Sequence, residues 1–386
     1  MNNPLKIVAD ENMPALDTMF NGFSVTRVAG RTMSAKDVET ADVLLVRSVT
    51  QVNEALLSRA KHLKMVGTAT IGMDHLDQAY LLDRGIPFFN APGCNAEAVV
   101  DYVLAAIHNL LPEDFPLRGL TVGIIGAGNV GGRLQKRLSL AGINTLVCDP
   151  PRALAEGEEG FTRLDTLLSN SDVVCMHTPL TTVGNFATYH MLGEAELRLL
   201  KPGAVLINAG RGPVVDNQAL SRVMDQRNDL IVALDVWEHE PSVDKDLADK
   251  VALGSPHIAG YSLDGKLRGT YMLRERLSEL LGIAAPPPLR DLLPLAPISS
   301  VTVTESASVL DVISVVYSVV SDDRRFRRSL SAVNQAASFD LLRKNYPVRR
   351  EFSTLTVNGV VDPYKRQLLS AFGFNLSPVS THVPSE

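Results

Sequence analysis

The sequence has few of the features that mark secreted or membrane-bound proteins. Its 386 residues include only three cysteines, Cys94, Cys148 and Cys175, and no CxxC pair. This odd and sparse set favours a reducing compartment over a disulfide framework. No apolar run approaches the ~18 residues that a membrane span requires. The first residues, MNNPLKIVADEN, lack the basic and apolar regions of a signal peptide. We therefore expect a cytoplasmic protein with no membrane partner.

The sequence also has no excess of positive charge, since 37 Lys and Arg residues against 43 Asp and Glu residues give a formal net charge of −6. Nothing global therefore attracts nucleic acid. Two Arg-rich stretches near the C-terminus, DDRRFRR and RKNYPVRR, could form a nucleic-acid arm, but acidic and apolar residues interrupt them. We expect no nucleic-acid partner. We predict no metal site either, because the sequence has no HExxH motif and its Cys and His residues are scattered.

What the sequence does have is a regular alternation of short β-branched runs and amphipathic stretches, which predicts parallel sheets joined by crossover helices. In the first part we expect strands at 5–9, 43–47, 65–68 and 86–89, and helices at 53–60 and 75–84. Asn95 is a predicted N-cap of a helix whose apolar residues form one stripe. From Thr121 the pattern is that of a doubly wound sheet. Its predicted helices include 130–140, 194–200 and 217–226, and a long helix over 263–281 follows.

The glycines of GAGNVG, Gly126, Gly128 and Gly131, lie between a predicted strand and a predicted helix. In such a turn the first glycine permits the sharp bend, the second lets a pyrophosphate approach the backbone, and the third lets the helix pack on the strand. The helix N-terminus then faces the phosphates. Asp149, at the end of the next predicted strand, can accept both ribose hydroxyls and repel a 2′-phosphate, which favours NAD. Nearby Arg152 could instead accommodate that phosphate.

Three further segments at predicted strand ends carry the groups that oxidation of a hydroxy acid requires. INAGRGPVVD contains Arg211, whose guanidinium can hold a carboxylate by two parallel hydrogen bonds. ALDVWEHEP contains Asp235 and Glu240, and SPHIAG contains His257. A histidine near neutral pH can take the hydroxyl proton, and a carboxylate on its other nitrogen fixes the tautomer. Taken alone, Arg211 could form an ion pair, Glu240 could cap a helix and His257 could be an ordinary loop histidine. Together, their positions at three predicted strand ends after one dinucleotide-binding loop favour a catalytic role.

These segments resemble the D-isomer-specific 2-hydroxyacid dehydrogenases over about residues 5–282. The similarity includes GTATIGMDHLD, GIIGAGNVG, HTPL, NAGRGPVVD, DVWEHEP and PHIAG. The resemblance implies that Arg211, Glu240 and His257 carry catalysis. It also implies a substrate-binding domain of residues 1–95 completed by 261–285, an NAD-binding Rossmann domain of residues 96–260, and a cleft that closes. We expect His177 of HTPL to have no role beyond lining the cofactor cleft.

A narrower resemblance is to the branch of this family that acts on a phosphorylated four-carbon acid. ADEN, LLVRSVT, APGCNA, CDPPR and PHIAGYSLDGKLRGT carry it, with SDDRRFRRSL and FDLLRKNYPVRRE near the C-terminus. It implies NAD-dependent oxidation of 4-phospho-D-erythronate to 2-oxo-3-hydroxy-4-phosphobutanoate in pyridoxal 5′-phosphate biosynthesis. It further implies a homodimer formed through a C-terminal α+β domain of residues 286–386. By position, Ser48, Thr70 and Tyr261 match substrate contacts. The matching cofactor contacts are Gly126, Gly128, Asn129, Val130, Gly131, Asp149, Thr178, Ala209, Gly210, Arg211, Asp235 and Gly260.

A phosphorylated substrate carries roughly two extra negative charges at neutral pH, so hydroxyls and cations should converge near it. Arg47, Ser48, Lys266 and Arg268 are candidates, although Lys266 and Arg268 could equally form the polar face of a helix.

Two alternatives remain at this point. One is another D-2-hydroxyacid dehydrogenase, such as a phosphoglycerate or glycerate dehydrogenase. The other is a nucleotide-sensing module, which the joint presence of Arg, Glu and His disfavours because a sensor needs no proton base.

Overall fold

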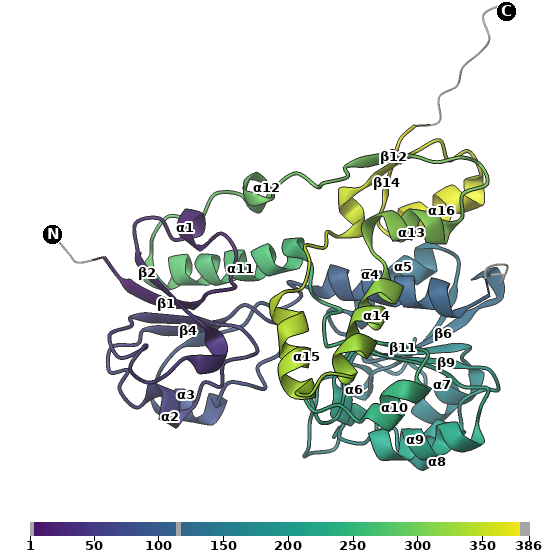
Figure 1. Ribbon diagram of the computed structural model, residues 1–386, viewed down its shortest axis with the longest axis horizontal. Helices are drawn as coiled ribbons and strands as arrows, with labels where there is room; N and C mark the ends of the chain where they lie inside the picture. Colours follow the sequence, from purple (N-terminus) through teal and green to yellow (C-terminus); the bar gives the residue numbers. More distant parts are fainter. Residues whose placement is uncertain (1–3, 113–116, 379–386) are drawn as a thin grey trace, which may run out of the picture. The chain divides into compact units, whose positions relative to one another are not determined.

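The computed structural model describes residues 4–112 and 117–378. The chain divides into two compact units (Figure 1). Unit 1 comprises Met1–Ala96 and Tyr261–Leu295, and unit 2 comprises Glu97–Gly260 and Ala296–Glu386. The chain therefore passes between the units three times, after Ala96, Gly260 and Leu295. Among the described residues, no helix has both the length and the apolar character to cross a membrane.

Unit 1 is built on a parallel sheet with the strand order β2-β1-β3-β4-β5. Alternate residues of the buried strands face opposite sides, as the two-residue period of a strand requires. Ile7 and Leu45 pack with α1 and α11, whereas Val8 and Leu44 pack with α2 and α3. Helices thus cover both faces. The elements are β1 (Lys6–Asp10), α1 (Leu16–Met19), β2 (Ser24–Val28), η1 (Gly30–Thr32), β3 (Val43–Val46), α2 (Glu54–Leu57), β4 (Met65–Thr68), α3 (Gln78–Asp83), β5 (Phe88–Phe89), α11 (Leu263–Leu281) and α12 (Leu289–Leu292).

Unit 2 is built on a second parallel sheet, with the strand order β11-β10-β9-β8-β6-β7. The chain first moves outward from β6 to β7 and then returns to the other side of β6 as β8. Such a reversal of strand order is where open α/β sheets bind ligands. The elements are α4 (Ala96–Leu110), η2 (Leu117–Gly119), β6 (Thr121–Ile125), α5 (Gly131–Leu140), β7 (Asn144–Cys148), α6 (Pro150–Glu156), α7 (Leu164–Asn170), β8 (Val173–Met176), α8 (Glu194–Arg198), β9 (Val205–Asn208), η3 (Gly212–Val214), α9 (Asn217–Gln226), β10 (Ile231–Leu234), α10 (Lys245–Lys250) and β11 (Leu253–Gly254).

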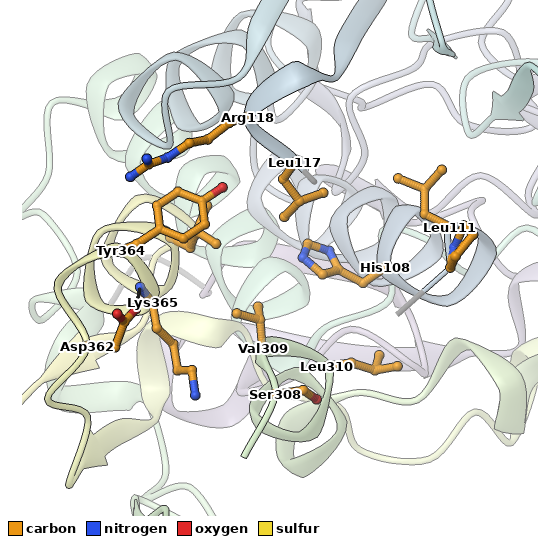
Figure 2. Close-up of a pocket in the computed structure, with 12 residues that line it drawn as sticks. His108, Leu111, Leu117, Arg118, Ser308, Val309, Leu310, Asp362, Tyr364 and Lys365 are labelled. Carbon is orange, nitrogen blue, oxygen red and sulfur yellow. Dashed lines mark hydrogen bonds between the residues drawn. The ribbon is translucent and has the colours of Figure 1, made fainter. Parts of the chain in front are cut away.

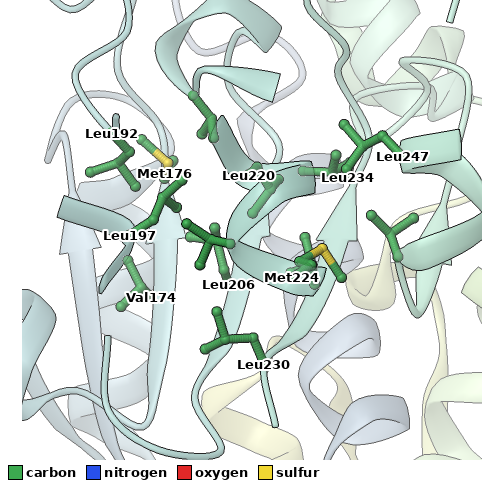
Figure 3. Packing of buried hydrophobic residues seen from close by; sticks show 14 of the residues in the cluster. Val174, Met176, Leu192, Leu197, Leu206, Leu220, Met224, Leu230, Leu234 and Leu247 are labelled. Carbon is green, nitrogen blue, oxygen red and sulfur yellow. The ribbon is translucent and has the colours of Figure 1, made fainter. Parts of the chain in front are cut away.

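One face of the unit 2 sheet holds the largely aliphatic core drawn in Figure 3. Val174 and Leu206 project from the strands, while Leu197 of α8 and Leu220 of α9 close over them, and all four are fully buried. Burying one such side chain contributes about 1.5–3 kcal/mol. This packing fixes the strands, and thereby the loops that leave their carboxyl ends.

The C-terminal segment packs within unit 2. Phe326 stacks on Trp237 with ring centroids 5.1 Å apart, and Phe339 joins the same core. A small parallel sheet of order β12-β13-β14 completes the segment. Its elements are β12 (Ser300–Thr302), α13 (Val309–Val316), α14 (Val319–Leu330), α15 (Gln335–Lys344), η4 (Phe352–Thr354), β13 (Thr356–Asn358), α16 (Pro363–Ala371) and β14 (Asn375–Leu376).

The predicted fold class of two doubly wound parallel sheets with a C-terminal α+β segment is confirmed. The helices over 217–226 and 263–281 end where they were predicted. The prediction that Asn95 caps α4 is wrong: the helix begins directly after it, but its Oδ1 is buried and has no hydrogen-bond partner within residues 4–112 and 117–378. The turn is closed by the backbone instead, since Ala96 N donates to Gly93 O at 3.2 Å.

Candidate active site

The residues predicted to form the cofactor and catalytic sites in unit 2 follow the carboxyl ends of its strands. Because all six strands run parallel, these ends lie along one edge of the sheet. Gly126 follows β6, Asp149 follows β7 and Thr178 follows β8. Ala209, Gly210 and Arg211 follow β9, Asp235 and Glu240 follow β10, and His257 and Gly260 follow β11.

The glycine-rich loop is close-packed at two of its glycines and open at the third. Gly126 has a φ of +86°, and a Cβ there would lie 2.9 Å from the backbone nitrogen of Thr178. A Cβ on Gly131 would lie 2.0 Å from the carbonyl oxygen of Gly126. At Gly128, by contrast, no described atom would come within 4 Å of a Cβ. The loop therefore leaves space at the position where a pyrophosphate would approach. Asn129 and Val130 complete it before α5 begins.

Asp149 connects this loop to the end of β7. Its Oδ2 accepts a hydrogen bond from Ala127 N at 2.8 Å, and its Oδ1 accepts one from Arg152 N at 3.1 Å at the start of α6. Each carboxylate oxygen keeps a further lone pair, so the side chain can still accept bonds from ribose hydroxyls. Arg152 pairs with Glu156 at 2.7 Å and donates to Ala127 O at 2.8 Å. These bonds engage Arg152 and so weaken the case that it binds a 2′-phosphate.

The structure brings Glu240 and His257 into direct contact. His257 Nδ1 lies 2.8 Å from Glu240 Oε2, while Glu240 Oε1 accepts a hydrogen bond from Trp237 N at 2.8 Å. Burial by itself raises the pKa of the Glu240 carboxyl. The charge and hydrogen bond of His257, the charge of Arg343 and the Trp237 amide outweigh burial and lower that pKa. A carboxylate here makes Nδ1 the protonated nitrogen, so the half-buried imidazole can accept a proton at Nε2.

Asp235 organises the loop that carries His257. Its side chain is 1% exposed and accepts hydrogen bonds from Ser255 Oγ at 2.6 Å, Ile258 N at 2.8 Å and Ala259 N at 2.9 Å. Burial raises the pKa of Asp235 in spite of these donors. The sequence prediction gave Asp235 a cofactor contact only. The additional structural role depends on Ser255, which no motif singled out, and on Tyr102, whose hydroxyl lies 3.0 Å from Ser255 Oγ.

Arg211 lies in the loop between β9 and η3. Asn208 shapes this loop, since its Nδ2 donates to Arg211 O at 3.0 Å and its Oδ1 accepts from Gly210 N at 3.1 Å. The loop packs closely against the Glu240 segment, because a Cβ on Gly212 would lie 2.0 Å from Trp237 O. The segments that bear Arg211, Glu240 and His257 are therefore neighbours within unit 2.

Two partly buried side chains beside this edge have buried polar atoms that lack partners in the described part of the chain. They are His177, through both ring nitrogens, and Thr178, through Oγ1. Burial lowers the pKa of His177 to about 4, so the imidazole is neutral at physiological pH. The open space at Gly128, the carboxylate of Asp149 and the unpartnered hydroxyl of Thr178 together fit a dinucleotide, which supplies phosphates and hydroxyls.

Although the sequence suggested no metal cluster, three potential ligands come together at His190, Asp216 and Glu238. His190 Nε2 already lies 2.5 Å from Glu238 Oε1, and Glu238 Oε2 accepts from Asn217 N at 3.1 Å. Asp216 caps α9 through Ala219 N. These side chains bond to one another and to backbone amides, which gives the group a structural role without an ion.

The predicted substrate contacts lie in unit 1, again after strand ends. Ser48 follows β3 and is exposed, and Thr70 follows β4 and donates to Gly72 O at 2.9 Å. Tyr261 precedes α11 and receives two cations on its ring: Arg47 at 5.5 Å and Lys266 Nζ at 4.7 Å from the ring centroid. Arg268, the remaining candidate for a phosphate, donates to Cys94 O. Arg47 and Lys266 thus converge on Tyr261, whereas Arg268 is engaged by the backbone.

A cavity of about 500 Å³ lies elsewhere in unit 2 (Figure 2). His108 of α4, Arg118 of η2 and Tyr364 of α16 are among the residues that line it, and Arg118 lies 4.3 Å from the centroid of the Tyr364 ring. None of the site residues predicted from the sequence is among its lining residues.

Comparisons with known proteins agree with this geometry. The family profile described as D-isomer specific 2-hydroxyacid dehydrogenase, NAD binding domain, matches residues 109–259. A second profile, described as a domain of unknown function, matches residues 292–373. The match to the first profile confirms the prediction of NAD as the cofactor.

Two curated relatives and one solved structure illustrate the similarity. The erythronate-4-phosphate dehydrogenase of Pseudomonas fluorescens (strain Pf0-1) is 50% identical over 376 residues, which is 95% of this chain and 98% of the relative. That of Klebsiella pneumoniae (strain 342) is 47% identical, over 96% of this chain and 98% of the relative. D-Lactate dehydrogenase from Aquifex aeolicus, solved with NAD and lactic acid, has a TM-score of 0.61 at 27% identity and covers 72% of this chain and 95% of its own.

Proposed function

This chain belongs to the erythronate-4-phosphate dehydrogenase family, and we propose that it oxidises 4-phospho-D-erythronate to 2-oxo-3-hydroxy-4-phosphobutanoate with NAD. The observation that carries the proposal is the Glu240–His257 pair, which follows a glycine-rich dinucleotide loop at the carboxyl edge of the same sheet. From the name of these relatives, we further propose that the reaction belongs to pyridoxal 5′-phosphate biosynthesis. We also propose a cytoplasmic homodimer, in which the C-terminal segment serves dimerisation.

The residues proposed to hold NAD surround the open edge of the glycine-rich loop. Backbone amides from Gly128 to Gly131, at the N-terminus of α5, would face the pyrophosphate. Asp149 would accept hydrogen bonds from the ribose hydroxyls. Thr178, Ala209, Gly210, Asp235 and Gly260 line the remainder of the cofactor's path. When bound, NAD supplies the acceptor for the hydride that leaves C2 of the substrate.

His257 is the proposed proton acceptor. In its neutral form Nδ1–H donates to Glu240 and Nε2 is free to take the proton of the C2 hydroxyl. The imidazolium that results is stabilised by the Glu240 carboxylate 2.8 Å away. Transfer of the hydroxyl proton to Nε2 thereby accompanies the loss of hydride from C2, and the C2 carbonyl forms.

Arg211 is proposed to hold the C1 carboxylate of the substrate. Its guanidinium presents several N–H donors in one plane, which suits a carboxylate accepting two parallel hydrogen bonds. This fixes the orientation of C2 relative to His257. We expect loss of Arg211 to reduce both substrate affinity and kcat, because orientation in such a site contributes to the rate itself.

In unit 1, Ser48, Thr70 and Tyr261 are the proposed substrate contacts, and Arg47 and Lys266 are proposed to attract the 4-phosphate. Both cations lie on the ring of Tyr261 and are half-buried. Removing either charge should raise KM for the phosphorylated substrate about 10-fold or more, as expected for a charge-assisted hydrogen bond, and should leave KM for NAD within about twofold.

Arg84→Ala is a matched control for that experiment. Arg84 also lies on a tyrosine ring of unit 1, at 5.6 Å from the Tyr80 centroid, but it is no part of the proposed site. Equal effects of Arg47→Ala and Lys266→Ala on both KM values would remove the phosphate role.

The proposed reaction is tested by measuring NADH at 340 nm with 4-phospho-D-erythronate, D-3-phosphoglycerate and D-glycerate as substrates. A parallel assay with added 2-oxo acid should detect NADH that stays bound, with the 2-oxo product as readout. We expect a strong preference for 4-phospho-D-erythronate that His257→Ala abolishes. Turnover of another 2-hydroxy acid alone would retain the reaction class and reject the substrate.

A further inference from the structure

Arg349 is a buried arginine of the C-terminal segment that contacts the loop carrying His257. Its side chain is 5% exposed, and its guanidinium lies 4.1 Å from the centroid of the Tyr317 ring. One guanidinium nitrogen donates to the carbonyl oxygen of Ala259 at 2.7 Å and also to that of Ala98. A cation of this kind holds carbonyl oxygens more strongly than a neutral donor does.

The loop that Arg349 contacts requires support because of its backbone conformation. His257 has a φ of +56°, in the left-handed region that residues with a Cβ rarely adopt. Such a conformation persists only where the surrounding structure holds it in place. Asp235 provides one side of that support, through the amides of Ile258 and Ala259. Arg349 provides another, through the carbonyl of Ala259.

The second bond of Arg349 extends this support to α4. Ala98 lies in the first turn of that helix, and Phe352, three residues after Arg349, donates its amide to Asp101 Oδ2 at 2.9 Å. Ala98 and Ala259 both lie within two residues of a point at which the chain passes between the units. One guanidinium therefore joins the unit 2 ends of two of the three crossings.

We propose that Arg349 is a positioning residue for proton transfer, which holds the Ala259 carbonyl and thereby keeps His257 in line with Glu240 and the substrate. It acts through the loop and is not itself a catalytic residue. The inference rests on the proposed function for the role of His257. It assigns to the C-terminal segment a part in catalysis in addition to the proposed dimerisation.

Arg327 provides a matched control. It too is an arginine of the C-terminal segment that donates to two backbone carbonyls, Ala248 O at 3.0 Å and Val251 O at 2.8 Å. These carbonyls lie at the end of α10 and before β11, and Arg327 also pairs with Asp323, which accepts from Gly254 N; neither carbonyl belongs to residues 257–260. Arg327→Ala therefore reports the general cost of loosening the C-terminal segment.

The kinetic test compares Arg349→Ala, Arg349→Lys and Arg327→Ala in the full-length protein. A displacement of about 1 Å at a reacting group costs roughly 10²-fold in rate. We expect Arg349→Ala to lower kcat by about that factor and to leave the Kd for NADH within about threefold. Lysine keeps the charge but not the planar donor geometry, so its kcat should be intermediate. Arg327→Ala should retain kcat even where it lowers Tm.

A double-mutant cycle with Glu240→Gln, which keeps a measurable rate, shows whether Arg349 acts through the pair of His257 and Glu240. If it does, Arg349→Ala should cost little further activity once the Glu240 carboxylate is absent, and the two losses should not add. Additive losses would overturn the proposal. So would a kcat for Arg349→Ala equal to that of Arg327→Ala. If Arg349→Ala does not fold, the same comparisons apply to Arg349→Lys.

Hydrogen exchange separates this inference from the proposed function, because it needs no substrate. The amides of Ile258 and Ala259 should exchange about 10-fold faster in Arg349→Ala than in the wild type, and should not do so in Arg327→Ala. Unchanged exchange would refute the positioning role, even if the enzyme oxidises 4-phospho-D-erythronate. Faster exchange in a protein that does not turn over this substrate would retain the loop contact and reject the reaction.

Discussion

Replacing Glu240 by Gln removes one charge from the pair with His257 and leaves the size of the side chain unchanged. The wild-type carboxylate accepts two hydrogen bonds, from His257 Nδ1 and from Trp237 N, one at each oxygen. An amide offers only one acceptor oxygen. If that oxygen faces Trp237, the NH₂ group faces Nδ1, and His257 must then carry its proton on Nε2, where it can no longer accept one. If it faces His257, the NH₂ group is opposed to the Trp237 amide.

The rate loss can be calculated from the lost charge. Two unit charges about 4 Å apart interact by about 4 kcal/mol at an effective dielectric constant of 20. Since about 1.4 kcal/mol corresponds to a factor of ten, loss of the carboxylate should lower kcat by as much as about 10³-fold. We expect a decrease of about 10²- to 10³-fold, because the imidazolium forms only as the reaction proceeds. The KM for NAD should change by less than about threefold.

The assay is steady-state NADH formation with saturating NAD, for Glu240→Gln and for Glu238→Gln as a control. Glu238 lies on the same loop, but its carboxylate bonds to His190 and to Asn217 N. The control therefore removes an equal charge without touching His257, and we expect its kcat to stay within about threefold. A Glu240→Gln enzyme with wild-type kcat would refute the role assigned to this pair.

Three further predictions concern the cofactor edge of unit 2. Asp149→Asn should lower kcat/KM for NAD by about 10-fold or more, the value of a charge-assisted hydrogen bond, and raise the ratio of NADP to NAD use; an unchanged ratio would remove Asp149 from cofactor selection. Gly131→Ala should reduce Tm because its Cβ meets Gly126 O at 2.0 Å, whereas Gly128→Ala should fold normally and raise only the KM for NAD; equal Tm losses would contradict this contrast. Burial lowers the pKa of His177 from 6.5 to about 4, so the unfolded chain binds a proton at a higher pH than the folded chain. The free energy of unfolding should therefore fall by about 3 kcal/mol as the pH decreases from about 6.5 to 4. Urea denaturation of His177→Leu should lack this decrease, and a parallel pH dependence in both proteins would exclude His177 as its source.

The sequence predicted the fold well where hydrophobic periodicity was strong. Ser262 caps the N-terminus of the long helix Leu263–Leu281, and Gly282 follows its C-terminus. The residues next to each end therefore indicate both boundaries. The edge strand Ser24–Val28 was missed, because most of its residues are exposed or only partly buried and it lacks an apolar run. The Asn95 cap failed for a different reason: the residue type favours capping, but its oxygen does not reach the backbone amides.

The candidate site was predictable to the extent that its residues follow strand ends in recognisable motifs. The pairing of Glu240 with His257 was predicted from chemistry and is observed at 2.8 Å. The structural role of Asp235 could not be predicted from the sequence. Its partners Ser255, Ile258 and Ala259 come next to it only because β10 pairs with β11. The contact of Arg349 with Ala259 joins residues 90 positions apart, and no spacing in the sequence indicates it.

The most direct test of the central claim follows the hydride itself, with 4-phospho-D-erythronate deuterated at C2 as the substrate. If the enzyme catalyses the proposed oxidation, mass spectrometry should find the reduced nicotinamide one mass unit heavier than with unlabelled substrate, together with an equal amount of 2-oxo-3-hydroxy-4-phosphobutanoate. His257→Ala should form neither product at an appreciable rate. Reduced nicotinamide without deuterium, or deuterium retained in the organic product, would contradict hydride transfer from C2.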